Sequence, residues 1–327
     1  MIIARTPLRM SFVGGGTDLP DFANEHGGAV VSTSIDKWIS VVVSPRFEDG
    51  LRVSYSITEI VPDVSALQHE LVREAMRSVG ITRGVEIVTV ADVPSRGTGL
   101  GSSSAVTVGL LQALSAHLGI YHSPQQLAEE ASRIEIEVLG KPIGRQDQYA
   151  SAVGGFNLIE FLPGGRGAAV SPIVAPDGTL EALHRSLMLF HVGTDRQAGD
   201  VLGEQREATR SGGATEALLA MRDMAYEMRD VLAAGDAAGV GPLLHRNWQL
   251  KRGLTGSVST DGIDAAYDAA MEAGATGGKL LGAGGGGFLL MCAPVDRHGA
   301  VRGALPALRE VPFRFTARGS HVALVVR

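Results

Sequence analysis

The sequence predicts an α+β protein with two domains, for three reasons. At 327 residues the chain is long enough for two domains of usual size. Segments rich in Val, Ile, Ser and Thr dominate the first part of the chain, whereas helical patterns dominate the last part. A Gly- and Pro-rich zone containing "LPGGRGAAV" and "APDGT" lies between them. We therefore expect one domain over residues 1–185 and a second over residues 186–327.

In the first half, strands are expected before helices. The segments "MIIARTPLRMSF", "GGAVVSTSI", "WISVVVSP" and "LRVSYSI" are strand-like, and a helix at 64–79 and the strand "VEIVTVA" follow. From Ser102, apolar residues recur at three- and four-residue spacing until Gly119, and glycine commonly follows a helix. Ser123 precedes a proline, which is a typical helix start, and we expect this helix to reach Leu139.

The second half is predicted to be mainly helical. The strand "GGFNLIEF" leads into the Gly- and Pro-rich zone, and the strand "SLMLFHVG" follows that zone. Helices are expected over residues 198–210, 214–234, 236–252 and 260–273, with closing strands near 312–326. The sequence contains no fixed-period repeat and no low-complexity tail, which again fits an α+β chain in two halves.

The composition favours a small-molecule partner. The 29 Lys and Arg residues against 35 Asp and Glu give a net charge of −6, which argues against a general binder of nucleic acid or membrane surfaces. The single cysteine, Cys292, lies in an apolar run and has no partner for an intramolecular disulfide. No run approaches the roughly 18 apolar residues of a membrane span, and the N-terminus does not resemble a signal peptide. We therefore expect a cytoplasmic protein.

The stretch "PSRGTGLGSSSA" lies directly before a predicted helix. A helix N-terminus presents up to four unpaired N–H groups and about half a positive charge, which favours phosphate binding. Glycines at 97, 99 and 101 allow the backbone to approach a ligand, and the serines at 102–104 can cap the helix, contact phosphate or bind Mg²⁺. The loop suits a polyphosphate, although alone it is equally consistent with a flexible loop and a serine N-cap. It lacks the Walker A lysine, which disfavours a P-loop NTPase.

Two further glycine clusters each join a strand to another element. "PLRMSFVGGGTDLP" breaks a strand and then presents Thr17 and Asp18, and a plain turn is the alternative for it. "KLLGAGGGGF" formally satisfies G-x-G-x-x-G from Gly282 to Gly287, but too few residues follow for a Rossmann unit. Three such clusters favour one shared site. Neither a zinc-ligand spacing nor the G-x-S-x-G elbow of serine hydrolases occurs.

Taken together, "PLRMSFVGGGTD", "PSRGTGLGSSSA" and "KLLGAGGGGF" resemble the three motifs of the GHMP kinase superfamily in order and spacing, over nearly the whole chain. With "GRQDQYASAVGGF", the chain looks closest to the branch that phosphorylates D-glycero-D-manno-heptose 7-phosphate at C1 for nucleotide-activated heptose, a branch that also resembles L-fucokinases. The resemblance implies an N-terminal domain of ribosomal-protein-S5-domain-2 type and a ferredoxin-like C-terminal domain, with ATP and sugar between them. It also implies ATP phosphate contacts at Gly97, Gly99, Leu100, Gly101, Ser102, Ser103 and Ser104.

The resemblance further implies two catalytic residues. Asp147, in "GRQDQYA", matches the family's catalytic aspartate, which would orient or deprotonate the acceptor hydroxyl; a surface or helix-capping aspartate is the alternative. Arg9 matches an arginine that galactokinases place beside that aspartate, where its charge would keep the carboxylate ionised. Asp18 matches a residue that accepts hydrogen bonds from sugar hydroxyls. Galactokinase has a glutamate at the position of Gly15, which puts galactose itself in doubt.

For Mg²⁺, the resemblance implies one hydroxyl ligand, Ser103, and one carboxylate ligand, Glu135 in "RIEIEVLG". Mg²⁺ prefers hard oxygen ligands and keeps several waters, so these two ligands with phosphate oxygens form a reasonable shell. Glu137 lies about 200° around a helix from Glu135, so only one of them can face the cleft. The distance to Gly140 matches the family pattern for Glu135, and the reverse assignment or two solvated glutamates stays open.

The expected partner is a sugar or sugar phosphate, with a homodimer left open. The residues implied to contact this acceptor are Gly15, Gly16, Thr17, Asp18, Gly284 and Gly285. An acceptor that already carries a phosphate needs cations or amides far from its anomeric hydroxyl. Candidate cations are Arg145, Arg196, Arg206, Lys251 and Arg252, but each taken singly is better explained as a solvated surface charge. Lys279 is a candidate for neutralising ATP phosphates instead.

Three other functions remain as alternatives. An L-fucose or other unphosphorylated sugar 1-kinase would need no pocket for a distal phosphate. A small-alcohol or isoprenoid kinase is disfavoured by "GGGTD" and "RQDQ". A non-catalytic regulator that senses sugar and ATP is disfavoured because Asp147, Ser103 and Glu135 occur together, and a sensor needs neither a base nor metal ligands.

Overall fold

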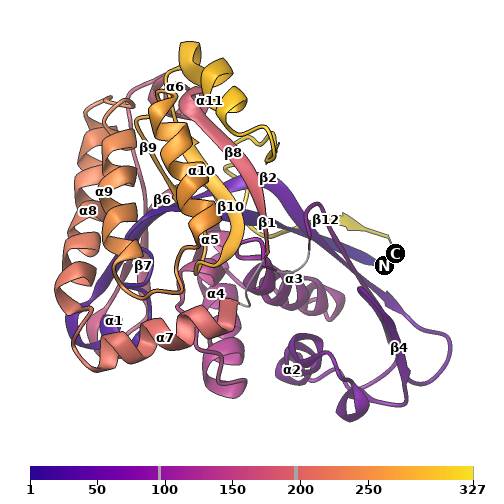
Figure 1. Ribbon diagram of the computed structural model, residues 1–327. Coiled ribbons are helices and arrows are strands. Elements are labelled where there is room, and N and C mark those ends of the chain that lie inside the picture. The colour runs from indigo at the N-terminus through magenta and orange to yellow at the C-terminus, as the bar shows by residue number, and fades with distance from the viewer. Residues whose placement is uncertain (95–96, 195–197, 327) are drawn as a thin grey trace.

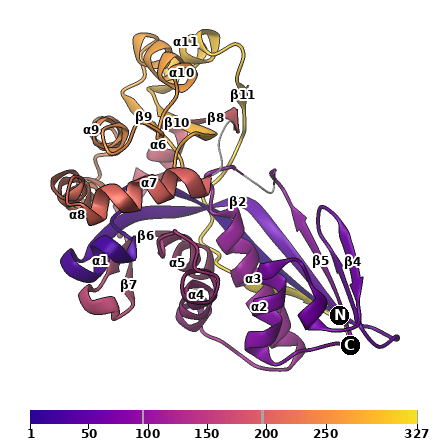
Figure 2. The same ribbon diagram turned by 60° about the horizontal axis from the view of Figure 1, so that its bottom comes forward.

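The computed structural model describes residues 1–94, 97–194 and 198–326, and it confirms an α+β fold with two sheets (Figures 1 and 2). The larger sheet has the strand order β12-β1-β2-β5-β3-β4, and β6 and β7 extend it from β2. Its strands are β1 (Ile2–Val13), β2 (Gly28–Pro45), β3 (Leu51–Ser54), β4 (Thr58–Val61), β5 (Val85–Ala91), β6 (Phe156–Phe161), β7 (Ala168–Pro172) and β12 (His321–Val325).

Strand β2 is the long central strand of this sheet. It pairs with β6 over its first residues and with β5 over its last, while β1 runs along its other edge. The sequence predicts two separate strands here, and the structure shows one. The pairing register shifts opposite Pro7 and Leu8, and this β-bulge accommodates Asp36 and Lys37, the polar pair between the predicted strands.

Helix α3 (Ser102–His117) packs on β1 and β2 and is surrounded by further helices. Those neighbours are α2 (Glu70–Val79), α4 (Pro124–Ser132) and α5 (Gln146–Val153). Because α3 lies between the sheet and three helices, apolar and small side chains are buried around most of its surface. Leu118, which we expected in the apolar pattern, lies beyond the helix and is 44% exposed.

The start of α4 follows the sequence prediction. Ser123 accepts a hydrogen bond from the N–H of Gln126, whose side chain accepts one from the N–H of Ser123, so the two form a capping box. After Ser132 the chain continues as a π-helical turn, η2 (Arg133–Val138). Such turns are rare and are frequent at functional sites. This one contains Glu135.

The smaller sheet is antiparallel, with the strand order β11-β8-β10-β9. Its strands are β8 (Leu187–Thr194), β9 (Gly277–Leu280), β10 (Gly286–Cys292) and β11 (Arg309–Glu310). The remaining helices are α1 (Pro20–His26), α6 (Thr179–Ser186), α7 (Ala198–Arg210), α8 (Thr215–Ala233), α9 (Val240–Arg252), α10 (Asp261–Glu272) and α11 (His298–Ala304). A separate apolar core around Phe190, Trp248, Tyr267 and Leu289 joins this sheet to its helices.

The end of the chain returns to the larger sheet. Strand β12 pairs with β1, and Phe315 forms an isolated bridge with Ile35. The closing strands expected near 312–326 are therefore one short strand and one bridge. The division of the chain at residue 186 stays a prediction: the second sheet begins with β8, but β12 and α8 both pack against the first sheet.

Candidate active site

The three glycine clusters meet in the structure. The backbone N–H of Arg9 on β1 donates to the carbonyl of Leu100 at 3.1 Å. Gly99 packs against the Leu281–Gly282 peptide, and both glycines have positive φ. A Cβ on Gly99 would collide with the carbonyl of Leu281, and one on Gly282 would collide with Gly99. Only glycine at both positions permits this approach of the second and third clusters.

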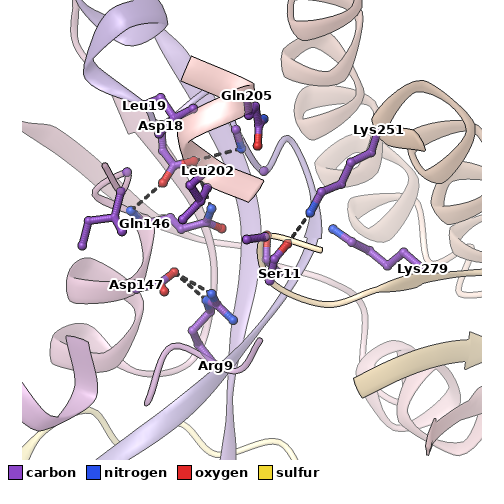
Figure 3. Close-up of a pocket in the computed structure, with 16 residues that line it drawn as sticks. Arg9, Ser11, Asp18, Leu19, Gln146, Asp147, Leu202, Gln205, Lys251 and Lys279 are labelled. Atoms are coloured by element: carbon purple, nitrogen blue, oxygen red, sulfur yellow. Dashed lines mark hydrogen bonds and ion pairs between the residues drawn. The ribbon is translucent and has the colours of Figure 1, made fainter. Parts of the chain in front are cut away.

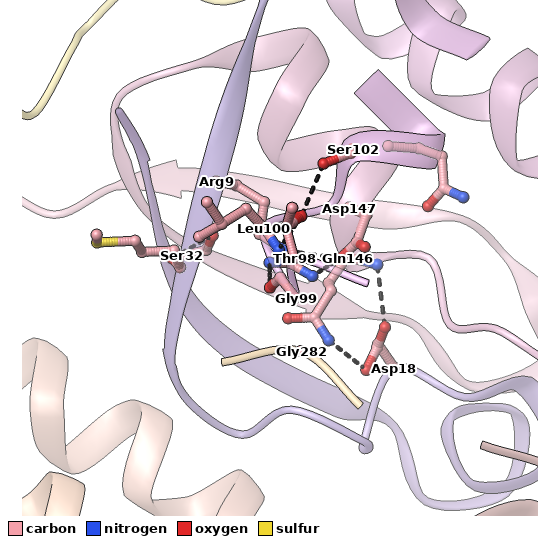
Figure 4. A network of polar contacts seen from close by, with 12 residues as sticks. Arg9, Asp18, Ser32, Thr98, Gly99, Leu100, Ser102, Gln146, Asp147 and Gly282 are labelled. Atoms are coloured by element: carbon pink, nitrogen blue, oxygen red, sulfur yellow. Dashed lines mark hydrogen bonds and ion pairs between the residues drawn. The ribbon is translucent and has the colours of Figure 1, made fainter. Parts of the chain in front are cut away.

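Arg9 and Asp147 form an ion pair at the centre of the site (Figure 4). Nε and Nη2 of Arg9 each lie 2.7 Å from Oδ1 of Asp147, and Nη1 donates to the carbonyl of Gly99 at 2.6 Å. The side chain of Arg9 is 4% exposed and that of Asp147 is 25% exposed. Because both contacts use Oδ1, the other carboxylate oxygen of Asp147 is left for a ligand.

Helix α3 begins beside this ion pair without a side-chain cap. Its N-cap residue is Gly101, with φ 74°, and no side-chain cap of this helix is found among the residues that the structure describes. The hydroxyl of Ser102 instead bonds to that of Thr98 at 2.8 Å. Ser103 is exposed. The first-turn N–H groups and the positive end of the helix dipole are therefore available to an anion.

Ser103 also contacts Glu135. Its hydroxyl donates to Oε2 of Glu135 at 3.2 Å, and Nε2 of Gln148 donates to Oε1 at 3.2 Å. Glu135 is fully buried, and burial raises its pKa, while Glu137 of the same turn is exposed. The nearby Lys141 forms its ion pair with Glu70 instead. The structure thus places Glu135, and not Glu137, beside Ser103.

This pair of residues fits Mg²⁺ chemically. A carboxylate and a hydroxyl are hard oxygen ligands, and a buried carboxylate without a cation gains from a divalent ion. Within the described ranges, no group of three or more His, Cys, Asp or Glu side chains is arranged to hold a metal alone. A magnesium ion at Ser103 and Glu135 would therefore need phosphate or water oxygens to complete its shell.

A cavity of about 70 Å³ lies next to Asp147 (Figure 3). Asp18 is buried in its wall and accepts hydrogen bonds from the N–H of Gly16 at 3.0 Å and from the N–H and Nε2 of Gln146 at 3.1 and 3.0 Å. Burial raises the pKa of Asp18, although the two backbone hydrogen bonds act in the opposite direction. Gly15 also lines the cavity.

Three polar atoms in the cavity wall are buried and have no hydrogen-bond partner in the described part of the chain. They are Oγ of Ser11, Oε1 of Gln146 and Nε2 of Gln205. Buried polar atoms are nearly always hydrogen-bonded in folded proteins, so these atoms indicate positions for polar groups of a ligand. None of these three residues was predicted from the sequence to contact a ligand. Gln146 and Ser11 lie inside quoted motifs, whereas nothing in the sequence marks Gln205.

A larger hollow of about 630 Å³ adjoins the start of α3. Ser102, Ser103 and Val106 of α3 form one wall, and residues of β5 and the start of α2 form others. The hollow and the small cavity are connected by one segment, because Gly99 contacts Arg9 of the cavity and Ser103 lines the hollow. Residues 99–103 therefore run between the two spaces.

Several residues expected to contact a ligand make contacts within the protein instead. The hydroxyl of Thr17 donates to the carbonyls of Gly14 and Ala29 at 2.8 and 3.1 Å and stabilises the turn. Gly284 packs against Val258, and the N–H of Gly285 donates to the carbonyl of Val258 at 3.1 Å. Gly282 and Ala283 of the same cluster line the cavity instead. The side chains of Leu100 and Ser104 are buried, so only their backbone groups are open to the phosphate contact expected from the sequence. Gly97 lies earlier in the loop and has φ 67°.

The cations considered for a distal phosphate differ in whether they line the cavity. They are Arg145, Arg196, Arg206, Lys251 and Arg252. Lys251 lines the cavity, as does Lys279. Arg206 pairs with an aspartate of α1 at 2.6 Å, and Arg252 pairs with an aspartate of α10 at 3.0 Å. Arg145 is not in the cavity wall, and Arg196 lies outside the described residues.

A helix start open to an anion, beside an arginine-held aspartate and a polar cavity, suits phosphoryl transfer to a small molecule. Comparison with protein families agrees with this class. The model of the GHMP kinases N terminal domain matches residues 66–155, and the model of the GHMP kinases C terminal matches residues 228–310. The chain belongs to the GHMP kinase family and is an ATP-dependent kinase. In the part that the structure describes, no helix is both long and apolar enough to cross a bilayer.

Within this family, the chain is similar to kinases of sugars. It is 28% identical to a D-glycero-alpha-D-manno-heptose 7-phosphate kinase of Campylobacter jejuni, over 97% of each chain. It is 25% identical to an L-fucokinase/L-fucose-1-P guanylyltransferase of Bacteroides fragilis, over 92% of this chain and 35% of the relative. The crystal structure of a D-glycero-D-manno-heptose 1-phosphate kinase from Bacteroides thetaiotaomicron has the same fold, with a TM-score of 0.82, 24% identity and full coverage of both chains.

Proposed function

We propose that the protein is an ATP- and Mg²⁺-dependent sugar 1-kinase whose acceptor is the anomeric hydroxyl of D-glycero-D-manno-heptose 7-phosphate. The product would be the 1,7-bisphosphate. The observation that supports this most is the Arg9–Asp147 pair, which lies between the loop before α3 and a cavity with unpaired polar atoms. The similarity to the heptose 7-phosphate kinase over nearly the whole chain supports the choice of acceptor.

In this proposal the adenine of ATP occupies the 630 Å³ hollow. The hollow shares Ser102 and Ser103 with the start of α3, so a nucleotide bound there has its phosphates at the helix N-terminus. The phosphates then follow the backbone toward Gly99 and Arg9. Free N–H groups and the helix dipole stabilise their charge.

Ser103 and Glu135 would hold the magnesium ion. Gln148 fixes the direction of the Glu135 carboxylate through its hydrogen bond to Oε1, which leaves Oε2 toward Ser103. When bound, the ion neutralises charge on the β- and γ-phosphates.

Asp147 is the residue we assign to the acceptor. Arg9 holds Oδ1, so Oδ2 can orient the anomeric hydroxyl and accept its proton during transfer. The guanidinium of Arg9 also opposes the negative charge that develops on the transferred phosphoryl group. The unpaired atoms of Ser11, Gln146 and Gln205 would bind the other hydroxyls of the sugar.

The cavity has room for only a few water molecules, so a heptose phosphate requires a wider space. Leu202 and Gln205 of α7 form part of its wall. Arg206 and Arg210 of this helix pair with Asp21 of α1 at 2.6 and 2.9 Å. We expect α7 to shift outward on α1 when the acceptor enters, as covering elements do in many kinases.

The test is an assay of purified protein with ATP, Mg²⁺ and three acceptors: the heptose, its 7-phosphate and L-fucose. ADP release gives kcat and KM, and ³¹P NMR of the product gives the position of the new phosphate. We expect the highest kcat/KM for the 7-phosphate and a new phosphate on C1. A higher kcat/KM for L-fucose or the free heptose would favour an unphosphorylated sugar 1-kinase. ATP binding without phosphorylation of any acceptor would favour a sensor and remove the proposal.

A further inference from the structure

Two buried lysines enter the cavity from different elements. Lys251 comes from α9 and is 4% exposed, and Lys279 comes from β9 and is 1% exposed. Figure 3 shows both ammonium groups on the side of the cavity away from Asp147 and Gln146. Nζ of Lys251 donates to the carbonyl of Gly282, and Nζ of Lys279 donates to a backbone carbonyl of β1 at 3.0 Å.

Each ammonium group has spare hydrogen-bonding capacity. A lysine has three N–H donors, and a single protein acceptor is found for each of these two. Neither lysine forms an ion pair with a carboxylate among residues 1–94, 97–194 and 198–326. Two donors per lysine therefore remain for a ligand in the cavity.

The cavity wall carries more basic than acidic side chains. The basic side chains are those of Arg9, Lys251 and Lys279, and the carboxyl groups are those of Asp18 and Asp147. Asp147 already pairs with Arg9, and Asp18 accepts from backbone N–H groups and an amide side chain. Burial lowers the pKa of both lysines, that of Lys251 to about 8, and the charge of Arg9 acts in the same direction. The carboxylate of Asp18 opposes this shift at both lysines but does not cancel it. A buried ammonium without a carboxylate costs folding free energy, which a bound anion would offset.

We propose that Lys251 and Lys279 bind the phosphate that the acceptor already carries, and that these two residues thereby select sugar monophosphates over free sugars. This inference rests on the proposed kinase activity. A phosphate monoester has a charge of about −1.5 to −2 near pH 7, which matches two ammonium groups. ATP has a separate site for its own phosphates at the start of α3, and the lysines lie across the cavity from Asp147, where the acceptor hydroxyl would react.

The experiment compares Lys251→Met and Lys279→Met with the wild-type protein. Methionine has a similar length and no charge. KM and kcat are measured for the heptose 7-phosphate, the unphosphorylated heptose and ATP. For each variant we expect KM for the 7-phosphate to rise by about 10- to 100-fold, the loss typical of a hydrogen bond to a charged group. The kcat/KM for the free heptose and the KM for ATP should change by less than about threefold.

Two further variants show whether a loss of affinity comes from the lost charge or from misfolding. Lys251→Arg keeps the positive charge and should recover most of the affinity for the 7-phosphate. Arg252→Met removes a neighbouring cation of α9 that pairs outside the cavity with Asp264 at 3.0 Å, and it should leave both acceptors unaffected. Equal losses for the phosphorylated and free sugars, or a raised KM for ATP, would overturn the inference and assign the lysines to other groups.

A binding experiment separates this inference from the proposed reaction. If the wild-type protein phosphorylates no sugar, the proposed function fails, but sugar binding can still be measured by thermal unfolding. We then expect the heptose 7-phosphate to raise the Tm of the wild type and not that of Lys251→Met, with free heptose giving no difference between them. The same Tm increase in both proteins would contradict a phosphate site at these lysines.

Discussion

The variant Asp147→Asn tests the role of the carboxylate beside the cavity. Arg9 only donates hydrogen bonds, so the amide oxygen of the asparagine will take the place of Oδ1, and the amide nitrogen will face the acceptor. An amide nitrogen cannot accept the proton of the acceptor hydroxyl. Loss of a positioned base typically lowers the rate by about 10²–10⁴, or about 3–5 kcal/mol in activation free energy. We expect kcat to fall by this factor while KM changes by less than about threefold.

The same variant should remain folded. It removes the negative charge beside a buried arginine, but Asp147 is partly exposed and the hydrogen bond to Gly99 remains. We expect the free energy of unfolding to fall by about 1–3 kcal/mol, less than the total stability of a typical protein. Thermal unfolding measures this loss, and ADP release with the heptose 7-phosphate measures the rate. Glu137→Gln, at an exposed position of η2, is the matched control. An unchanged kcat in a folded Asp147→Asn protein would refute the assignment of this residue as the base.

Three further results are expected. Glu135→Gln should raise the Mg²⁺ concentration needed for half-maximal rate by about tenfold or more, whereas Glu137→Gln should not; equal curves would exclude Glu135 as a ligand. Gly99→Ala should lose activity and at least about 2 kcal/mol of stability, because its Cβ collides with a backbone carbonyl. Gly119 has a similar positive φ in open space, so Gly119→Ala should lose only about 1 kcal/mol. The kcat/KM for the sugar phosphate should fall as pH rises through about 8, where the Lys251 ammonium loses its proton, and also below about 6, where the substrate phosphate gains one. If kcat/KM of the Lys251→Met variant still fell above pH 8, the fall could not be assigned to this lysine.

Most helices were predictable because their signals are local. Ser123 and its proline mark the start of α4, and the spacing of apolar residues marks α3. The helices predicted at 198–210, 214–234 and 260–273 agree with α7, α8 and α10 to within one residue at each end. The helix expected at 64–79 is shorter, because a 3₁₀ turn comes first and α2 begins after His69, which accepts a hydrogen bond from the N–H of Val72.

Features that depend on pairing between distant segments were harder to predict from the sequence. The bulge that joins two predicted strands into β2 is set by the partner strand β1, and no local pattern indicates it. The return of β12 to the larger sheet is a long-range pairing of the same kind. The spacing of Glu135 and Glu137 limited the metal ligand to one of two, but only the fold shows which of them is buried beside Ser103.

The residues that line the cavity were also only partly predictable from the sequence. The glycine motifs favoured one shared site, and Gly99 and Gly282 of two of these motifs do pack against each other. Side chains that come from distant elements were not identifiable as a set, because Ser11, Gln205 and Lys279 share a cavity only through folding. Lysines are abundant on surfaces, so the sequence could not show that Lys251 lines the cavity. Its neighbour Arg252 forms an ion pair with Asp264 instead.

The most direct test is a crystal structure with a non-hydrolysable ATP analogue, Mg²⁺ and the heptose 7-phosphate. We predict that the triphosphate contacts the backbone of residues 99–104, with the anomeric oxygen at about hydrogen-bond distance from Oδ2 of Asp147. The distal phosphate should lie between Lys251 and Lys279. A nucleotide bound away from the start of α3, or an acceptor whose anomeric oxygen does not face Asp147, would contradict the account.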